Sequence, residues 1–142
     1  MPVPRRVVID PGVLISALIT PGGATATVLD LIEAEMITVI VSPHLLDELA
    51  EVLRRDKFDR YLEPGQAGQF IDGLRDRVEV VTDPDQIPPV SRDPDDDYLI
   101  ALTRTADADA LISGDADLTS VELTDLAILS PRTFLDRLTD ED

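Results

Sequence analysis

Carboxylates are the side chains of this sequence that are best placed to do chemistry. The stretch SRDPDDDYLIALTRTADADALISGDADL, residues 91–118, contains eight aspartates, no histidine and no cysteine. Like charges about 4 Å apart repel by roughly 4 kcal/mol at an effective dielectric of about 20, so a fold that gathers several of these groups needs a cation among them. Oxygen ligands suit Mg²⁺ or Mn²⁺, and such ions activate water and stabilise the leaving oxygen in phosphodiester cleavage.

The elements that must position these carboxylates follow an α/β pattern. Apolar, β-branched runs alternate with helical segments, which predicts a central, mainly parallel five-stranded sheet covered by helices on both faces. The expected strands are residues 5–10, 37–42, 78–81, 110–113 and 126–129. The expected helices are residues 13–19, 24–35, 43–55, 66–77 and 93–106, with a last helix beginning at 130–131.

Three acidic residues directly follow predicted strands. Asp10 follows the first strand, and Asp115 and Asp117 follow the fourth. Ligands of parallel sheets bind beyond the carboxyl ends of the strands, so these acids converge if the two strands are neighbours. The alternative is that Asp10 only caps the helix that follows it.

Two further acids are predicted from helical projection at about 100° per residue. Glu48 falls at the edge of the buried stripe of helix 43–55, where an ordinary surface glutamate is the alternative. In helix 93–106, Asp96 projects to the buried side and Asp97 away from it, which makes Asp97 the second choice. Acids in a first turn are also explained by the helix dipole. The candidate catalytic set is therefore Asp10, Glu48, Asp96, Asp115 and Asp117, and its predicted metal ligands are Asp10, Asp96 and Asp115.

Composition sets the broad class. With 142 residues and 44% hydrophobic residues, the chain is expected to form one domain, residues 1–142. The absence of cysteine excludes disulfides and thiolate metal sites, and no apolar run is long enough for a membrane span, so we expect a cytoplasmic protein without a membrane partner. The net charge of −17 argues against tight, nonspecific binding of nucleic acid, but an enzyme that uses metal ions and local arginines remains compatible with it.

Other residues are candidates for contacts to RNA or to a second copy of the chain. Arg54, Arg55 and Lys57, together with Arg92, are the predicted contacts to an RNA backbone, although a solvated helix end is the alternative. Tyr98 is a weak candidate for stacking on a base, with a place in the core or at the rim as the alternative. Helix 24–35 carries more apolar residues than one buried stripe needs, which suggests a dimer interface. Those residues are Val28, Leu29, Leu31 and Ile32.

The segments HLLDELAEVL, RDPDDDYLIAL and LISGDADL, which follow an aspartate after the first strand, resemble the PIN-domain nucleases. The resemblance covers essentially the whole chain and is closest to the branch described as toxin components of toxin–antitoxin pairs, related to VapC-type ribonuclease toxins. It implies a three-layer α/β/α fold and an endoribonuclease that depends on Mg²⁺ or Mn²⁺, in which water attacks the phosphorus and leaves a 5′-phosphate and a 3′-hydroxyl. It also implies a homodimer and a small antitoxin that covers the site. The family's metal-binding acids map to Asp10, Glu48, Asp96 and Asp115, with Asp117 assisting.

One departure from the family pattern follows Asp10. The family usually reads DTN or DTS, whereas this chain reads Asp10-Pro11-Gly12, which removes a polar side chain that orders the acidic site. Ser16 or water is the expected substitute. The alternative function is therefore a catalytically impaired PIN-like module that binds RNA or a protein partner. A phosphotransfer protein is disfavoured, because a haloacid-dehalogenase-like phosphatase needs an aspartate where Gly12 stands, and a receiver domain needs a lysine late in the chain, whereas Lys57 is early.

Overall fold

The computed structural model describes residues 3–139. Within them a five-stranded sheet has the order β3-β2-β1-β4-β5, and all four strand pairs are parallel. The strands are β1 (Arg6–Ile9), β2 (Thr38–Val41), β3 (Glu79–Val80), β4 (Ala110–Ile112) and β5 (Ala127–Leu129). The predicted parallel α/β architecture is confirmed.

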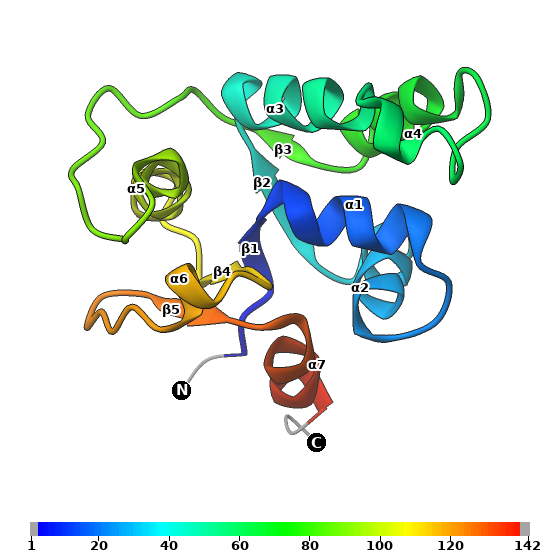
Figure 1. Cartoon of the computed structure of the whole chain (residues 1–142). Coiled ribbons are helices and arrows are strands. Elements are labelled where there is room, and N and C mark those ends of the chain that lie inside the picture. The colour runs from blue at the N-terminus through cyan, green and yellow to red at the C-terminus, as the bar shows by residue number, and fades with distance from the viewer. Residues whose placement is uncertain (1–2, 140–142) are drawn as a thin grey trace.

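Helices cover the sheet on both faces. In Figure 1, α5 lies on one side of the sheet, α1, α2 and α7 lie on the other, and α3 and α4 flank the edge formed by β2 and β3. The helices are α1 (Pro11–Ile19), α2 (Ala24–Glu33), α3 (Pro43–Leu53), α4 (Gln66–Arg75), α5 (Asp97–Thr105), α6 (Ala116–Thr119) and α7 (Pro131–Thr139). Short 3₁₀ turns span Asp56–Phe58 and Pro94–Asp96. The arrangement is the predicted three-layer fold.

The central strands form the middle of the core. Val7, Val8 and Ile9 of β1 have no exposed surface, and the β2 and β4 residues beside them are equally buried. Strands covered on both faces need continuous apolar runs, which explains why the sequence pattern located them correctly. Each buried strand ends where the chain turns polar, and this boundary places carboxylates at one edge of the sheet.

The first turn of the 93–106 segment differs from the prediction. It is a 3₁₀ turn over Pro94–Asp96, and the α-helix begins only at Asp97. Asp97 is 4% exposed, so the prediction that it points away from the buried side is wrong. A 3₁₀ turn rotates by about 120° per residue instead of about 100°, and a projection based on an α-helix therefore fails there.

Two further elements depart from the sequence pattern. The third strand is only two residues long and lies at the sheet edge, where Val80 is 51% exposed. The four-residue helix α6 has no counterpart among the predicted elements, because it is too short to show a helical period.

The apolar residues of α2 are largely used inside the chain. Val28 and Ile32 are each 1% exposed, and Leu29 and Leu31 pack partly buried against the same core. The expected dimer interface on this helix is therefore wrong for Val28 and Ile32, since α2 packs on α1 and α7 together and needs a wider apolar face. Among the described residues no single helix is long and apolar enough to cross a membrane, and α1 with α2 meets the criterion only as a pair bent by 97°.

Candidate active site

The carboxyl ends of β1 and β4 bring the predicted acids together. The two strands are neighbours in register, with Ile9 opposite Ile112, and the backbone N–H of Asp10 donates to the Ile112 carbonyl at 2.9 Å. A pocket of about 420 Å³ opens at this edge, and its walls include Asp10, Asp96 and Asp115. Three of the predicted acids, distant in the sequence, thus share one pocket.

Both oxygens of Asp10 accept hydrogen bonds. Oδ1 accepts from the backbone N–H of Gly12 at 2.9 Å, which caps α1, and Oδ2 accepts from the Ser113 hydroxyl at 2.8 Å. Asp10 therefore caps a helix and also lines the pocket. The two interpretations that the sequence left open are compatible.

Ser113 connects the two strand ends. It is fully buried, donates to Asp10 and accepts from the backbone N–H of Asp115 at 3.0 Å. Asp115 in turn accepts from the N–H of Asp117 at 2.9 Å, which starts α6. The sequence analysis missed Ser113, although a single polar residue that ends an apolar strand beside a predicted acid is a usable signal.

These contacts show what orients Asp10 although Pro11-Gly12 replaces the polar residue of the usual DTN or DTS pattern. Ser16, the expected substitute for the missing polar side chain, bonds to Thr25 instead, at 3.2 Å. Asp10 is oriented by the Gly12 N–H and by Ser113. A Cβ atom at position 12 would lie at an ordinary contact distance of 3.5 Å from Asp10 Oδ1, so glycine is not required there by space.

Asp96 is the acid with the most perturbed surroundings. Its Oδ2 is buried and has no hydrogen-bond partner among the described residues. Burial first, then the neighbouring carboxyl of Asp115 and the charges of Asp10, Asp115 and Asp93, raise the pKa of Asp96 from 3.8 to about 7. A buried acceptor without a donor is costly, and a cation beside it would remove that cost.

The donor set fits a hard divalent ion. All the candidate ligands are carboxylates, and among the described residues one of their buried oxygens has no hydrogen-bond partner. Within residues 3–139 no three acidic or histidine side chains already stand in a coordinating arrangement. Mg²⁺ does not require a complete set of protein ligands, because it binds one or two carboxylates and takes its remaining ligands from water and phosphate oxygens.

Glu48 reaches the acidic site through Tyr98. It is half-buried on α3, and its Oε2 accepts from the Tyr98 hydroxyl at 2.7 Å. Tyr98 is 5% exposed, which makes it a core residue and not a platform for base stacking, and the ring of His44 meets it edge-on at 4.4 Å. Burial, the bond to Glu48 and the charges of Asp10 and Asp96 raise the pKa of Tyr98, so the phenol stays a hydrogen-bond donor.

The remaining two candidate acids lie apart from the pocket walls. Asp97 Oδ1 accepts from the backbone and hydroxyl of Ser91, both at 2.8 Å, and from the N–H of Val90 at 3.2 Å. Burial alone would raise the pKa of Asp97, but these bonds outweigh it and lower the pKa. Asp97 thus anchors the loop before α5. Asp117 is half-buried, and its backbone N–H, not its carboxylate, contacts the site.

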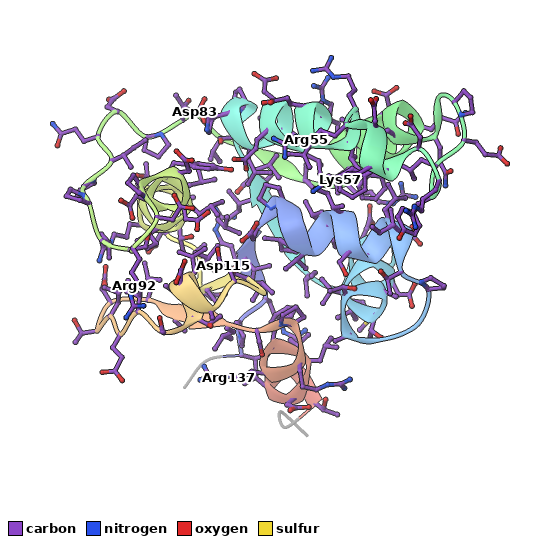
Figure 2. All side chains as sticks on the ribbon, viewed as in Figure 1. Arg55, Lys57, Asp83, Arg92, Asp115 and Arg137 are labelled. Atoms are coloured by element: carbon purple, nitrogen blue, oxygen red, sulfur yellow. The ribbon has the colours of Figure 1, made fainter. Side chains whose placement is uncertain are left out.

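The predicted basic contacts are exposed. Arg55 pairs with Glu51 at 3.8 Å, and Lys57 lies 5.2 Å above the Phe58 ring, whereas neither Arg54 nor Arg92 makes an ion pair with any described residue. In the view of Figure 2, Asp115 lies between Arg55 and Lys57 on the α3 side and Arg92 on the opposite side of α6.

A parallel sheet with carboxylates gathered at its carboxyl end defines an α/β protein with an acidic site. Within that class the chain belongs to the PIN domain family, whose model matches residues 6–117. The uncharacterised protein MJ1680 of Methanocaldococcus jannaschii is 36% identical over 118 residues, which cover 82% of this chain and 74% of that protein. PIN domains are generally nucleases that use divalent metals, so the family makes the chain a nuclease at the level of class.

Two solved structures share the fold. PAE2754 from Pyrobaculum aerophilum has a TM-score of 0.63 and 13% identity, with 96% of this chain and 90% of that chain covered. A chain of VapBC2 from Rickettsia felis, solved bound to a DNA fragment from their promoter, has a TM-score of 0.60 and 12% identity, with 87% and 97% covered. At these identities the similarity shows the fold alone.

Proposed function

We propose that this protein is an endoribonuclease that depends on Mg²⁺ or Mn²⁺. The observation that carries the proposal is the convergence of Asp10, Asp96 and Asp115 on one pocket, where the buried Asp96 Oδ2 has no hydrogen-bond partner within residues 3–139. Membership in the PIN domain family supports the nuclease class. The assignment of RNA as the substrate rests on the resemblance to ribonucleases of that family.

The three pocket carboxylates are the proposed ligands. A bound divalent ion neutralises charge on the scissile phosphate and makes water a stronger nucleophile at neutral pH. Ser113 and the Gly12 N–H fix Asp10, and Asp96 gives up its proton when a cation enters. Attack of water on phosphorus leaves a 5′-phosphate and a 3′-hydroxyl.

Glu48 and Asp117 are proposed as auxiliary acids at the edge of the site. Tyr98 holds Glu48 in place through a 2.7 Å hydrogen bond, so this carboxylate has a fixed orientation. Asp117 lies two residues after Asp115 in the first turn of α6, and its backbone N–H donates to Asp115 at 2.9 Å.

Four exposed basic residues are the proposed contacts to the RNA backbone. They are Arg54, Arg55, Lys57 and Arg92. Against a net charge of −17 these contacts give weak binding that falls steeply with salt. The ion in the pocket is then the main attraction for the phosphate.

We also propose that the protein is the toxin of a toxin–antitoxin pair and acts as a homodimer. The similarity in fold to a chain of VapBC2 supports the first point. A small partner that covers the acidic pocket would hold the enzyme inactive. Co-expression with the product of a short adjacent open reading frame, followed by light scattering and a cleavage assay, should yield an inactive complex. An active enzyme in that complex would refute the partnership.

The decisive experiment is cleavage of a labelled single-stranded RNA with Mn²⁺. Asp10→Asn and Asp115→Asn should each lower the rate by at least about 100-fold, because each replaces a charged ligand of the proposed divalent ion with a neutral one. Asp30→Asn makes the same chemical change on the exposed face of α2 and should keep full activity. Strong cleavage by both site variants would refute the proposal. No cleavage by the wild type, together with no Mn²⁺ binding in calorimetry at millimolar concentration, would favour the impaired binding module instead.

A further inference from the structure

The acidic pocket continues past the carboxylates to a pair of hydroxyl groups. Ser16 of α1 and Thr25 of α2 both line the pocket wall, and their oxygens lie 3.2 Å apart. Both side chains are half-buried. Nothing in the proposed hydrolysis uses them.

The bond between Ser16 and Thr25 differs from those of three other helix threonines, although Thr133 of α7 also bonds to a side-chain hydroxyl, that of Ser130. Thr27, Thr103 and Thr139 each donate to the backbone carbonyl four residues earlier, at 2.7–3.1 Å. That is the usual arrangement for a hydroxyl in a helix. Ser16 and Thr25 bond to each other at the pocket wall instead. Their shared bond uses one hydroxyl proton, so the pair keeps a second proton and several lone pairs for a ligand.

The position of the pair favours a neutral polar ligand group. Ser16 lies four residues along α1 from Gly12, whose N–H holds Asp10, and four residues of an α-helix rise about 6 Å. This distance is comparable to the span from a phosphate to the sugar beside it. The neighbouring carboxylates disfavour a second anion at this place, whereas a sugar hydroxyl can both donate to the pair and accept from it.

We propose that Ser16 and Thr25 bind the ribose 2′-hydroxyl of the nucleotide next to the scissile phosphate and thereby select RNA over DNA. The inference rests on the proposed ribonuclease function and specifies its substrate. The 2′-hydroxyl is the group by which proteins distinguish the two nucleic acids.

Binding can be measured without relying on cleavage. We would measure fluorescence anisotropy at low salt with Ca²⁺ in place of Mn²⁺, using one sequence as RNA, as DNA and as 2′-fluoro RNA. The 2′-fluoro strand keeps the ribose-like sugar shape but lacks the hydroxyl proton. Wild-type protein should bind RNA about 3- to 10-fold more tightly than either analogue, as expected for hydrogen bonds between neutral groups.

In the variant Ser16→Ala/Thr25→Val, the ratio of the affinity for RNA to the affinity for either analogue should fall close to one, because only RNA binding is weakened. Thr25→Ser, which keeps the hydroxyl, should preserve the ratio, and so should Thr27→Val, which removes a hydroxyl bonded back onto its own helix. Thermal melting checks the fold of each variant, and the single change Thr25→Val serves if the double variant unfolds.

Several results would overturn the inference. The first is a wild-type protein that binds RNA, DNA and 2′-fluoro RNA equally tightly. The second is a double variant that keeps the preference for RNA, and the third is a double variant that binds all three strands more weakly by the same factor. If the double variant loses the preference for RNA but the wild-type protein cleaves no RNA, the hydroxyl subsite is supported and only the nuclease function is rejected. The two proposals can therefore fail separately.

Discussion

Asp96 shows how the requirements of a charged site act on a single side chain. One of its oxygens is buried and has no donor in the part of the chain that the structure describes. Its carboxyl keeps a proton up to a pH of about 7, because burial and then the nearby acids raise its pKa. Such a group is poorly accommodated without a cation. In the cation-free protein this residue therefore lowers the stability of the folded state at neutral pH, and a bound ion would restore that stability.

Asp96→Asn should stabilise the metal-free protein at alkaline pH. Because the folded-state pKa is raised, the contribution of Asp96 to stability is full below 3.8 and is lost as the pH rises through about 7. Asparagine carries no charge to desolvate, so the free energy of unfolding in EDTA should rise by about 1–2 kcal/mol near pH 8, after allowance for solvent screening. The difference should shrink near pH 5. Urea titrations at both pH values measure it, and an equal effect at both would contradict the explanation.

Ser113 is predicted to matter for both activity and folding. Ser113→Ala removes the donor to Asp10 and leaves the Asp115 N–H without an acceptor, which should cost about 1–2 kcal/mol of stability and at least about 10-fold in cleavage rate. Ser130→Ala is the matched control, because its hydroxyl bonds to Thr133 at the start of α7 and, among the described residues, has no hydrogen bond to Asp10 or Asp115. Denaturation and RNA cleavage would be compared for the two variants. An unchanged rate in Ser113→Ala would contradict the positioning role.

At the scale of elements, a hydrogen bond from Tyr98 of α5 to Glu48 of α3 connects the two helices beside the site. Tyr98→Phe removes only the hydroxyl that holds Glu48, so the packing against His44 is kept. We expect a loss of about 1 kcal/mol in stability and a rate lowered about 3- to 10-fold. Tyr61→Phe, at a ring that is 51% exposed, should change neither property. Cleavage rates that are equal in all three proteins would show that Glu48 needs no orientation.

The elements also show which parts of the fold and site the sequence could predict. The buried strands are continuous apolar runs with an acid directly after them, so the parallel sheet and the shared edge of Asp10 and Asp115 follow from composition and chain order. The orientation of Asp97 could not be predicted in the same way, because a 3₁₀ turn changes the angle per residue. The contacts of Ser16 depend on how α1 packs on α2, which no local pattern contains.

At the scale of the whole molecule, the net charge of −17 opposes the compact state. Sodium chloride should raise the melting temperature by screening this repulsion, and the effect should level off as the Debye length falls. Magnesium chloride at matched ionic strength should add a second, saturable increase, because an ion that binds only the folded protein stabilises it by mass action.

That second increase separates a specific site from a generally acidic surface. At about ten times the dissociation constant it should reach about 1.4 kcal/mol, or a few degrees in melting temperature. Asp10→Asn/Asp115→Asn should keep the sodium effect and lose the saturable magnesium effect, whereas a double change of exposed acids, Asp30→Asn/Asp72→Asn, should keep both. If magnesium stabilises all three proteins equally, then the ion binds the surface at large and the pocket of Asp10, Asp96 and Asp115 is not its site. A difference confined to the pocket variant would show that the ion binds at Asp10 and Asp115.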